Sequence, residues 1–446
     1  MKCIEDEIPF ELPEGWAWCR LNSIVDVRDG THDTPTYVDK GIPLITSKNL
    51  VEGGIDYSNV KYISEKDAIS INDRSGVNIG DILFAMIGTI GNPSMVTEDI
   101  LISIKNVALF KFTFSKNLSN HFVMYFLDYA QEDMKNKPSG GLQPFVSLNF
   151  LRTYLVPVPP VEEQQRIVSI LADSINKIRN IDVLKNELTA SVKKAKSKIL
   201  DLAIRGKLVP QDPNDEPASV LLERIRVEKE ELIKQGKIKR DKKESIIFRG
   251  DDNSYYEKIG DDIENIDTEI PFNLPDNWIW CRGCSCFSGM ETTKPQGEFF
   301  DYIDIDSIDN RLHCIKKTKR IPVIEAPSRA SRAINSGSVL FSLVRPYLEN
   351  IALIEEIHSH SIASTGFYVC NSNGLLLPDY MFYLMISKYV VDGLNQYMKG
   401  DNSPSISGND IENWLYPIPP IDEQRRICYI LKTTFATIEK LEESLI

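Results

Sequence analysis

The chain has 446 residues, of which 42% are hydrophobic and 26% are charged, so it can bury two ordinary cores and lacks the composition of a disordered protein. Its formal net charge of −13 at first argues against a nucleic-acid partner. The distribution weakens that objection. Residues 251–269 alone hold eight acidic side chains against Lys258, about half of the imbalance, while basic residues cluster at 193–207 and 316–320.

The sequence gives no sign of export or of a membrane partner. The longest apolar run, near residues 82–87, is too short to cross a bilayer, and the first ten residues lack the basic and apolar pattern of a signal peptide. Eight cysteines without regular spacing are typical of reduced thiols. We therefore expect a soluble, cytoplasmic protein.

A first domain is predicted for residues 1–160. After a lead that reads IPFELPEGWAWCR from Ile8, short β-rich runs such as GIPLITSKNL at Gly41 and GDILFAMIGTIG at Gly80 are broken by Gly, Asn and Pro. HFVMYFLDYAQEDMK at His121 has the spacing of a short amphipathic helix. Together these patterns predict an α+β domain.

A long helix is predicted next, because residues 161–205 contain neither Pro nor Gly. Its apolar residues recur at threes and fours, which is the seam of a helix that pairs with another helix. At 1.5 Å per residue the helix is roughly 65 Å long. Residues 161–235 are interpreted as this spacer helix followed by a short charged helix.

The remaining chain predicts a linker, a second domain and a second helix. Residues 236–268 are polar and acidic and are interpreted as a charged linker with little fixed structure. Residues 269–420 repeat the α+β pattern, and 421–446 predict a shorter spacer helix. An antiparallel pair of unequal helices leaves part of the first unmatched, which would expose Val192, Ile199 and Leu202 unless residues 220–235 or another subunit cover them.

The two halves are a tandem duplication. IPFELPEGWAWCR at Ile8 returns as IPFNLPDNWIWCR at Ile270, and LVPVPPVEEQQRIVSIL at Leu155 returns as LYPIPPIDEQRRICYIL at Leu415. Between these matched ends the halves share little beyond GDILFA and GSVLFS. Two units with one frame and different contents suit two recognition modules on one scaffold.

This ordered set of motifs resembles the specificity subunits of type I restriction-modification systems over the whole chain. DGTHDTP at Asp29 and LITSKNL at Leu44 resemble one class of their target-recognition domains, and APSRASRAINSGSVLFSLVRPYLENIAL at Ala326 resembles another. The resemblance implies a noncatalytic subunit whose two α+β domains each read one half of a split, asymmetric site in double-stranded DNA. Long antiparallel coiled-coil helices would fix the gap between them.

The resemblance also implies partners and cofactors. Two modification subunits would methylate adenine with S-adenosylmethionine, and two restriction subunits would translocate and cleave DNA with ATP and magnesium. No cofactor is implied on this chain. Two alternatives stay open: a protein-binding coiled-coil adaptor, or the detached DNA-recognition part of a fused restriction and methyltransferase enzyme.

Candidate DNA contacts are short polar side chains beside turns, which suit base edges and phosphates, and arginines, whose rigid donor forks suit guanine edges or phosphates. The alternative is that DGTHDTP is only a capped turn and that the arginines form surface salt bridges. The candidates are Thr31, His32, Thr34, Thr46, Ser47, Lys48, Asn49, Arg329, Arg332, Arg345, Tyr347 and Asn350.

Candidate residues for docking the modification subunits follow the prolines of each frame, where capping and local packing are the equal alternative. They are Glu163, Gln164, Arg166, Glu423, Gln424 and Arg426.

Catalytic and metal sites are not predicted. Asn92-Pro93-Ser94-Met95 matches only the first half of a methyltransferase N-P-P-Y tetrad, and no phosphate-binding glycine loop is present. A zinc site at Cys281-x-x-Cys284-x-Cys286 is disfavoured, because Cys281 matches Cys19 in the repeat, where no second cysteine follows.

Overall fold

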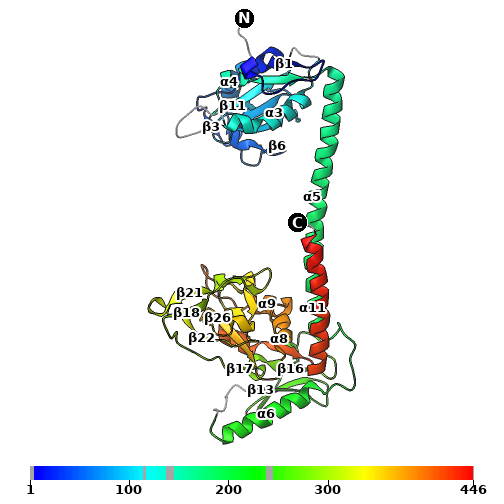
Figure 1. The fold of residues 1–446 in the computed structure, drawn as a ribbon, viewed down its shortest axis with the longest axis vertical. Coiled ribbons are helices and arrows are strands. Elements are labelled where there is room, and N and C mark those ends of the chain that lie inside the picture. The colour runs from blue at the N-terminus through cyan, green and yellow to red at the C-terminus, as the bar shows by residue number, and fades with distance from the viewer. Residues whose placement is uncertain (1–4, 114–116, 137–144, 238–244, 445–446) are drawn as a thin grey trace. The chain divides into compact units, whose positions relative to one another are not determined.

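The computed structural model describes residues 5–113, 117–136, 145–237 and 245–444. The chain divides into two compact units, Met1–Val183 and Leu184–Ile446, and the boundary falls inside the 44-residue helix α5 (Val161–Ile204). Each unit combines sheets with short helices (Figure 1). The prediction of mixed helix and sheet in both halves is therefore confirmed.

Unit 1 contains two four-stranded sheets and a two-stranded ribbon that joins the ends of the frame. The sheet orders are β2-β11-β8-β9, which is antiparallel, and β10-β4-β7-β3, which is mixed; β1 (Ala17–Arg20) pairs with β12 (Leu155–Val158). The bounds are β2 (Asp26–Asp29), β3 (Tyr37–Val38), β4 (Ile42–Ile45), β7 (Lys61–Ile63), β8 (Ile82–Ala85), β9 (Gly91–Met95), β10 (Ser103–Ile104) and β11 (Val107–Lys111). The helices and the small hairpin of this unit are α1 (Leu21–Ile24), α2 (Glu65–Ser75), α3 (Asn120–Asn136), α4 (Leu148–Thr153), η2 (Ser47–Asn49), β5 (Leu50–Val51) and β6 (Gly54–Ile55).

The central strands β8 and β11 are buried on both faces, which explains their unbroken apolar runs. On one face Phe84 and Phe110 meet edge-on, with ring centroids 6.3 Å apart, in a cluster that includes Phe122 and Leu127 of α3. On the other face Leu83 packs in a second cluster with residues of β4 and β10. The antiparallel sheet is thus the core from which the loops of unit 1 project.

Unit 2 repeats this plan. Its antiparallel sheet has the order β17-β26-β23-β24, its second sheet has the order β21-β18-β25-β22, and β16 (Ile279–Arg282) pairs with β27 (Leu415–Ile418). The other strands are β17 (Phe287–Ser288), β18 (Phe299–Ile303), β19 (Ile308–Asp309), β20 (Cys314–Ile315), β21 (Lys319–Pro322), β22 (Ala330–Ala333), β23 (Val339–Ser342), β24 (Ile351–Leu353), β25 (Ile362–Ser364) and β26 (Phe367–Ser372). The helices are α7 (Gly283–Cys286), η4 (Ile305–Ser307), η6 (Pro346–Leu348), α8 (Pro378–Met385), α9 (Lys388–Asn395), α10 (Gly408–Asn413) and α11 (Ile421–Glu443).

The two antiparallel sheets differ in one buried polar pair. In unit 1 the Lys111 ammonium donates to Asp81 Oδ2 at 2.7 Å and to the Gly76 carbonyl oxygen at 2.6 Å, and both charged side chains are 6% exposed. At the matching register of unit 2, Ser338 Oγ donates to Asn371 Oδ1 at 2.5 Å. An ion pair and a neutral hydrogen bond therefore fill the same place in the two copies.

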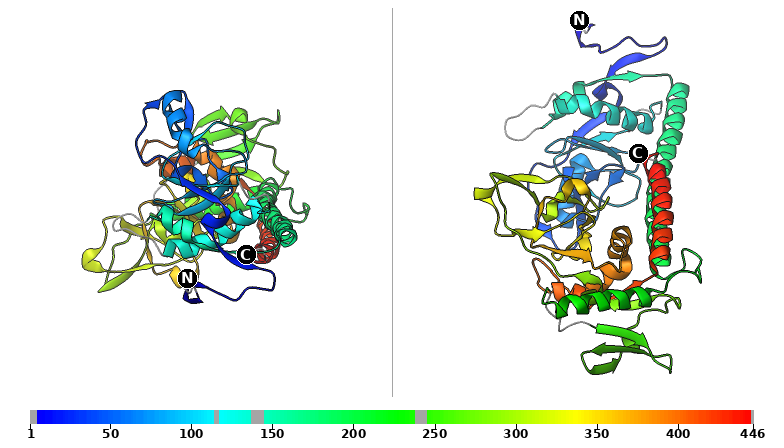
Figure 2. Two further views of the ribbon diagram at one scale, coloured as in Figure 1. Left: turned by 90° about the horizontal axis from the view of Figure 1, so that it is seen from above. Right: turned by 60° about the horizontal axis from the view of Figure 1, so that its bottom comes forward.

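The interpretation of residues 236–268 as a linker with little fixed structure is wrong for most of that segment. Residues 245–265 form an antiparallel sheet of β13 (Ser245–Arg249), β14 (Tyr255–Ile259) and β15 (Asp262–Asn265), close to helix α6 (Ala218–Lys234) (Figure 2). Residues 238–244 lie outside the described residues. The sheet is fixed to unit 2 because Arg282 donates to the Glu257 carboxylate at 2.7–3.2 Å.

Helix α11 lies alongside the C-terminal part of α5 in unit 2 (Figure 1). Lys196 Nζ donates to Glu442 Oε2 at 2.7 Å, and Leu200 of α5 shares a core cluster with Ile427 and Leu431 of α11. The expected exposure of Val192, Ile199 and Leu202 is wrong, since all three are partly buried.

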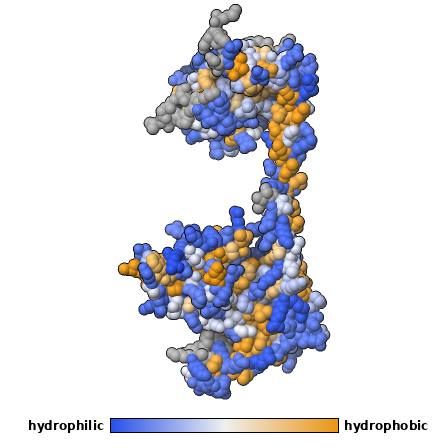
Figure 3. All heavy atoms as spheres, in the orientation of Figure 1, coloured by the Kyte–Doolittle hydropathy of each residue, from blue (hydrophilic) through white to orange (hydrophobic). Residues whose placement is uncertain are grey.

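The exposed apolar residues of α5 instead lie nearer its start, as Figure 3 illustrates along the helix. An antiparallel partner that begins beside the end of α5 covers that end first, and this accounts for the difference. The exposed large apolar residues and their fractions are Ile170 (66%), Leu171 (37%), Ile178 (59%), Ile181 (62%), Val183 (54%), Leu184 (62%) and Leu188 (46%). Of the helices within the described ranges, none has both the length and the apolar character that a bilayer crossing requires.

Candidate nucleic-acid interface

In unit 1 a turn of two residues, Lys105 and Asn106, joins the two segments that the sequence singled out. Thr31 N donates to the Ile104 carbonyl oxygen at 3.0 Å, and Asn106 N donates back to the Thr31 carbonyl oxygen at 3.2 Å. Ser47 Oγ donates to the Asn106 carbonyl oxygen at 3.3 Å. Segments 29–35 and 46–49 therefore form one surface, with the turn between β10 and β11 as its hub.

The backbone explains why this turn and loop have their residue types. Asn106 has a φ of 58°, in the left-handed region that Asn tolerates better than most residues. A Cβ built on Gly30 would lie 2.3 Å from the Ile104 carbonyl oxygen, so only glycine allows the loop to approach the turn this closely.

His32 is held between two acceptors. Its Nδ1 lies 2.8 Å from Asn106 Oδ1 and its Nε2 lies 2.9 Å from Asp29 Oδ2, while the ring is 58% exposed. Arg74 of α2 also donates to the Asp29 carboxylate. The hydrogen bonds with Asn106 and Asp29 raise the pKa of His32 above its usual value.

Asp29 is the anionic partner in this network. Burial opposes the ionisation of its carboxyl group, but the hydrogen bonds from Arg74 and His32 outweigh that effect and lower its pKa. The result is an ionised carboxylate beneath the side chains of Arg74 and His32, which lie toward solvent: the Arg74 side chain is 64% exposed, the His32 side chain 58% and Asp29 only 10%.

The other predicted contacts of unit 1 divide into exposed and structural residues. Thr34 and Lys48 are exposed, and Lys105 Nζ donates to Thr34 Oγ1 at 2.8 Å. Asn49 is only 6% exposed, and its Oδ1 accepts from Thr46 N at 3.0 Å and from Thr46 Oγ1 at 2.9 Å. The prediction that Asn49 faces DNA is therefore wrong, because its amide closes a capping box that shapes the loop.

Unit 2 has the same capping box at the equivalent place. Asp304 and Ser307 close it around η4, as Thr46 and Asn49 do around η2. The order strand, 3₁₀ turn, strand thus occurs in both units. The side chains of the neighbouring loops differ between the two units.

The predicted contacts of unit 2 surround strands β22 and β23. Arg329 is exposed and Tyr347 is 46% exposed, whereas Arg332 is half-buried in β22 and its Nε has no hydrogen-bond partner among the described residues. Arg345 has a left-handed φ of 49°, and its Nη2 donates to the Asn402 carbonyl oxygen at 3.0 Å. Asn350 is only 9% exposed, so its side chain is not accessible to DNA and the prediction that it contacts DNA is wrong.

Most of the predicted docking residues instead tie the long helices to their units. Trp16 Nε1 donates to Glu163 Oε2 at 3.1 Å, and Trp278 Nε1 donates to Glu423 Oε2 at 2.9 Å. Glu423 is fully buried, and burial raises the pKa of its carboxyl group. The repeated tryptophan and glutamate thus form an equivalent clasp in both units.

The repeated glutamines have the same role. Gln164 is 1% exposed and donates to the Pro159 carbonyl oxygen at 2.9 Å, while Gln424 is 0% exposed and donates to the Leu375 carbonyl oxygen at the same distance. The prediction that Gln164, Glu423 and Gln424 offer a docking surface is wrong, because packing within each unit already uses them. Arg166 is exposed and remains a candidate.

Arg426 is occupied by a pair of hydrogen bonds within unit 2. Its two terminal nitrogens donate to the Asp215 carboxylate at 3.0 and 2.5 Å. This fork fixes the turn before α6 against α11 and leaves Arg426 partly exposed.

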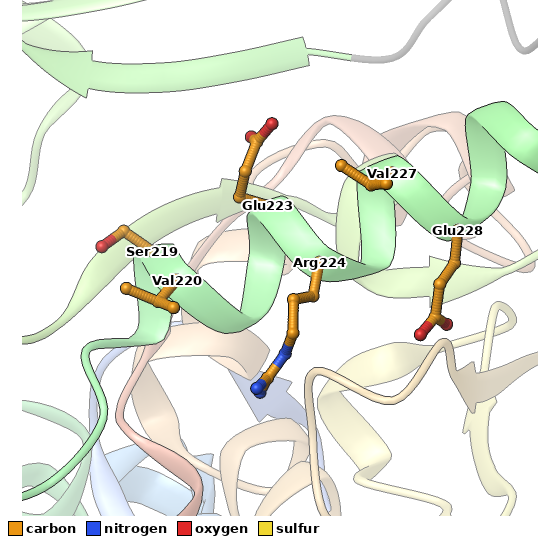
Figure 4. A pocket seen from close by; sticks show the side chains of 6 residues that line it. All are labelled: Ser219, Val220, Glu223, Arg224, Val227 and Glu228. Carbon is orange, nitrogen blue, oxygen red and sulfur yellow. The ribbon is translucent and has the colours of Figure 1, made fainter.

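Neither the depression on α6 nor the described His, Cys, Asp and Glu side chains form a further binding site. A depression of about 530 Å³ over α6 is lined by that helix alone (Figure 4). Its Arg224 donates to Glu216 at 2.6 Å. Across the described ranges no three His, Cys, Asp or Glu side chains are grouped to hold a metal ion.

The chain is similar to known proteins over nearly its whole length. The sequence model of the type I restriction modification DNA specificity domain matches residues 13–190. The specificity subunit of the type I restriction enzyme EcoAI from Escherichia coli is 27% identical, over 98% of this chain and 80% of its own length. The chain is therefore similar over nearly its whole length to type I restriction enzyme specificity subunits.

Two more comparisons cover nearly the whole of this chain. The EcoEI specificity subunit of Escherichia coli is 23% identical, over 100% of this chain and 82% of its own length. A chain from a solved structure on complex assembly and conformational transition of the type I R-M system has 17% identity, a TM-score of 0.64 and coverage of 98% and 94% of the two chains. That likeness concerns the fold, and the resemblance found in the sequence is confirmed.

The sequence did not point to three residues of the interface: Lys105, Asn106 and Arg74. The only signal for the turn was Lys-Asn between two apolar runs, a common pattern of short turns. Arg74 lies in a helix far along the chain, and its approach to Asp29 depends on the packing of α2.

Proposed function

We propose that the chain is a noncatalytic DNA sequence-specificity subunit in which each unit reads one half of a bipartite, asymmetric site in double-stranded DNA. The observation that carries this proposal is the repeated capping box, Thr46 with Asn49 and Asp304 with Ser307, below loops of different composition. An equivalent support that carries loops with different side chains suits two units that read different sequences.

The charge of the loops supports DNA as the ligand. In unit 1 the exposed Lys48 and Arg74 and the partly buried Lys105 surround short hydroxyl and amide groups, and in unit 2 Arg329 and Arg345 flank the corresponding sheet. Lysine and arginine contact phosphates and guanine edges, while threonine contacts either. The acidic segment 251–269 belongs mostly to the β13–β15 sheet, which is a separate part of unit 2.

The helices and the partners complete the proposal. Helices α5 and α11 would pair as an antiparallel coiled coil and fix the gap between the half-sites, since each base pair adds about 3.4 Å. The exposed apolar residues of α5 and Arg166 would contact the two modification subunits. Those subunits would supply S-adenosylmethionine, two restriction subunits would supply ATP and magnesium chemistry, and the complex would work in the cytoplasm.

Methylation mapping tests this function. The chain is co-expressed with the modification subunit encoded beside it in a host that lacks DNA methylation, and modified adenines are mapped by long-read sequencing. We expect a split motif with one modified adenine in each half. A stable complex that methylates a continuous motif, or none, would contradict the proposal, and failure to form any complex would favour the adaptor alternative.

A further inference from the structure

The His32 network contains more than a DNA-contact candidate. Both ring nitrogens of His32 lie within hydrogen-bond distance of oxygen acceptors, one on Asn106 and one on Asp29. A carboxylate has no proton to give, and the Asn106 carbonyl oxygen has none either. Only the doubly protonated ring donates to both at once, whereas a neutral ring has one N–H and leaves one of the two bonds unmade.

We propose that His32, in its imidazolium form, is a positioning residue that clamps the Thr31–Thr34 loop onto the Lys105–Asn106 turn, so that DNA reading by unit 1 requires His32 to be protonated. This inference rests on the proposed function. When the ring loses its proton, one of the two hydrogen bonds is lost and the loop is released from one side. The groups presented by the loop then lose their fixed position against DNA.

The charged groups around His32 decide the direction of the effect. Asp29 from β2 stabilises the imidazolium, and Arg74 from α2 opposes it, while the Asn106 amide oxygen accepts from the ring. Lys105 belongs to the turn, and its ammonium group donates a hydrogen bond to Thr34 on the loop that carries His32. The attractive contacts outweigh the repulsive ones, and bound DNA would add negative charge that favours the protonated ring further.

The clamp is specific to unit 1. In unit 2 the segment after β17 reads Gly-Met-Glu-Thr-Thr from Gly289, with no histidine, and it is fixed by backbone hydrogen bonds such as Thr293 N to the Ser331 carbonyl oxygen at 2.9 Å. Backbone groups do not titrate in the physiological range. The two half-sites therefore differ in their dependence on pH.

The test measures affinity against pH in the complex of the full chain with its modification subunits. A fluorescent duplex carrying the motif found by methylation mapping is titrated by anisotropy at fixed ionic strength from pH 5.5 to 8.5. Wild type should lose affinity above the pKa of His32, approaching tenfold per pH unit as for a single linked proton. The H32N variant should bind weakly with little pH dependence, and H121N, which changes an exposed histidine on α3, should follow wild type.

A second variant isolates the Asn106 contact. N106G suits the left-handed turn and keeps the carbonyl that accepts from Ser47, but it removes the side-chain oxygen. Its affinity should be lower than that of wild type and depend little on pH, because the ring then has no acceptor on the turn whether or not it is protonated. The pKa of His32 measured by NMR without DNA should shift downward in the same variant, which tests the clamp independently of DNA binding.

Each other outcome overturns a defined statement. Wild-type affinity that is flat from pH 6 to 8.5 would mean that the Asn106 amide turns to donate to a neutral ring, and the inference would be wrong. A pH slope that persists in H32N would place the titrating group elsewhere. Absence of binding to any duplex at any pH, together with a raised His32 pKa by NMR, would contradict the proposed function and leave the clamp as a folding feature only.

Discussion

The buried pair of Lys111 and Asp81 makes a quantitative prediction about unit 1. The K111M variant leaves the Asp81 carboxylate buried, with the Asn78 N–H at 2.8 Å as its remaining hydrogen bond of those described. Breaking one side of a buried ion pair costs about 3–5 kcal/mol. At about 1.4 kcal/mol per tenfold change, the opening of this sheet should become more frequent by two to more than three orders of magnitude.

The repeat supplies a matched control. The double variant D81S/K111N recreates in unit 1 the neutral bond that Ser338 and Asn371 make in unit 2. Because no charge is left unpaired, it should be less destabilised than K111M by at least about 2 kcal/mol. This difference separates the effect of an uncompensated charge from that of simply losing a lysine.

Hydrogen exchange with mass spectrometry measures both variants in the full chain. Peptides that cover β8 and β11 should lose protection in K111M, whereas peptides that cover β23 and β26 should not change, because local opening reports each unit separately. Equal protection of β8 and β11 in K111M and in the double variant would refute the reasoning, since the buried carboxylate would then carry no cost.

Three further predictions concern the buried Gln424, the loop at Gly30 and the β13–β15 sheet. Q424A should destabilise unit 2 by at least about 2 kcal/mol, because buried backbone groups lose their partners, whereas Q165A on the exposed side of α5 should change stability by less than about 0.5 kcal/mol. G30A should weaken DNA binding and lower the melting temperature, because a Cβ there meets a backbone oxygen at 2.3 Å. Hydrogen bonds from Arg282 outweigh burial and lower the pKa of Glu257, so the protection of β13–β15 should be constant above pH 5 and be lost as pH falls below the ordinary value of 4.5.

Their controls are equally specific. G289A should be tolerated, because a Cβ at Gly289 meets no heavy atom within 4 Å. For the added sheet, a loss of protection that begins near neutral pH would contradict the assignment to Glu257. If the melting curves of Q424A and Q165A were the same, water would replace the hydrogen bonds of the buried glutamine without loss of stability, and the prediction for Gln424 would be wrong.

The sequence predicted the features that depend on repetition and on long periodic patterns. The run without Pro or Gly after Pro160 placed α5, because a break in periodicity is a local property of the chain. The apolar runs at β8 and β23 gave the buried strands for the same reason.

The sequence failed where a side chain is committed by a distant partner. The acidic segment near Glu257 looked unstructured because its polar composition conceals the tie to Arg282, 25 residues away. Asn49 and Gln424 looked available to partners, although backbone groups brought near by folding use their amides. Asn106 was missed because its role arises only when two loops meet at its turn.

The most direct test of the account is whether the two units read separate half-sites. Methylation is mapped by long-read sequencing for the wild-type chain, for a T34A/K48A variant of unit 1 and for R329A in unit 2, each with the same modification subunit. The account predicts a split motif in which the unit 1 variant relaxes or loses discrimination in one half and the unit 2 variant does so in the other. A continuous motif, or a change in both halves from either variant, would contradict it.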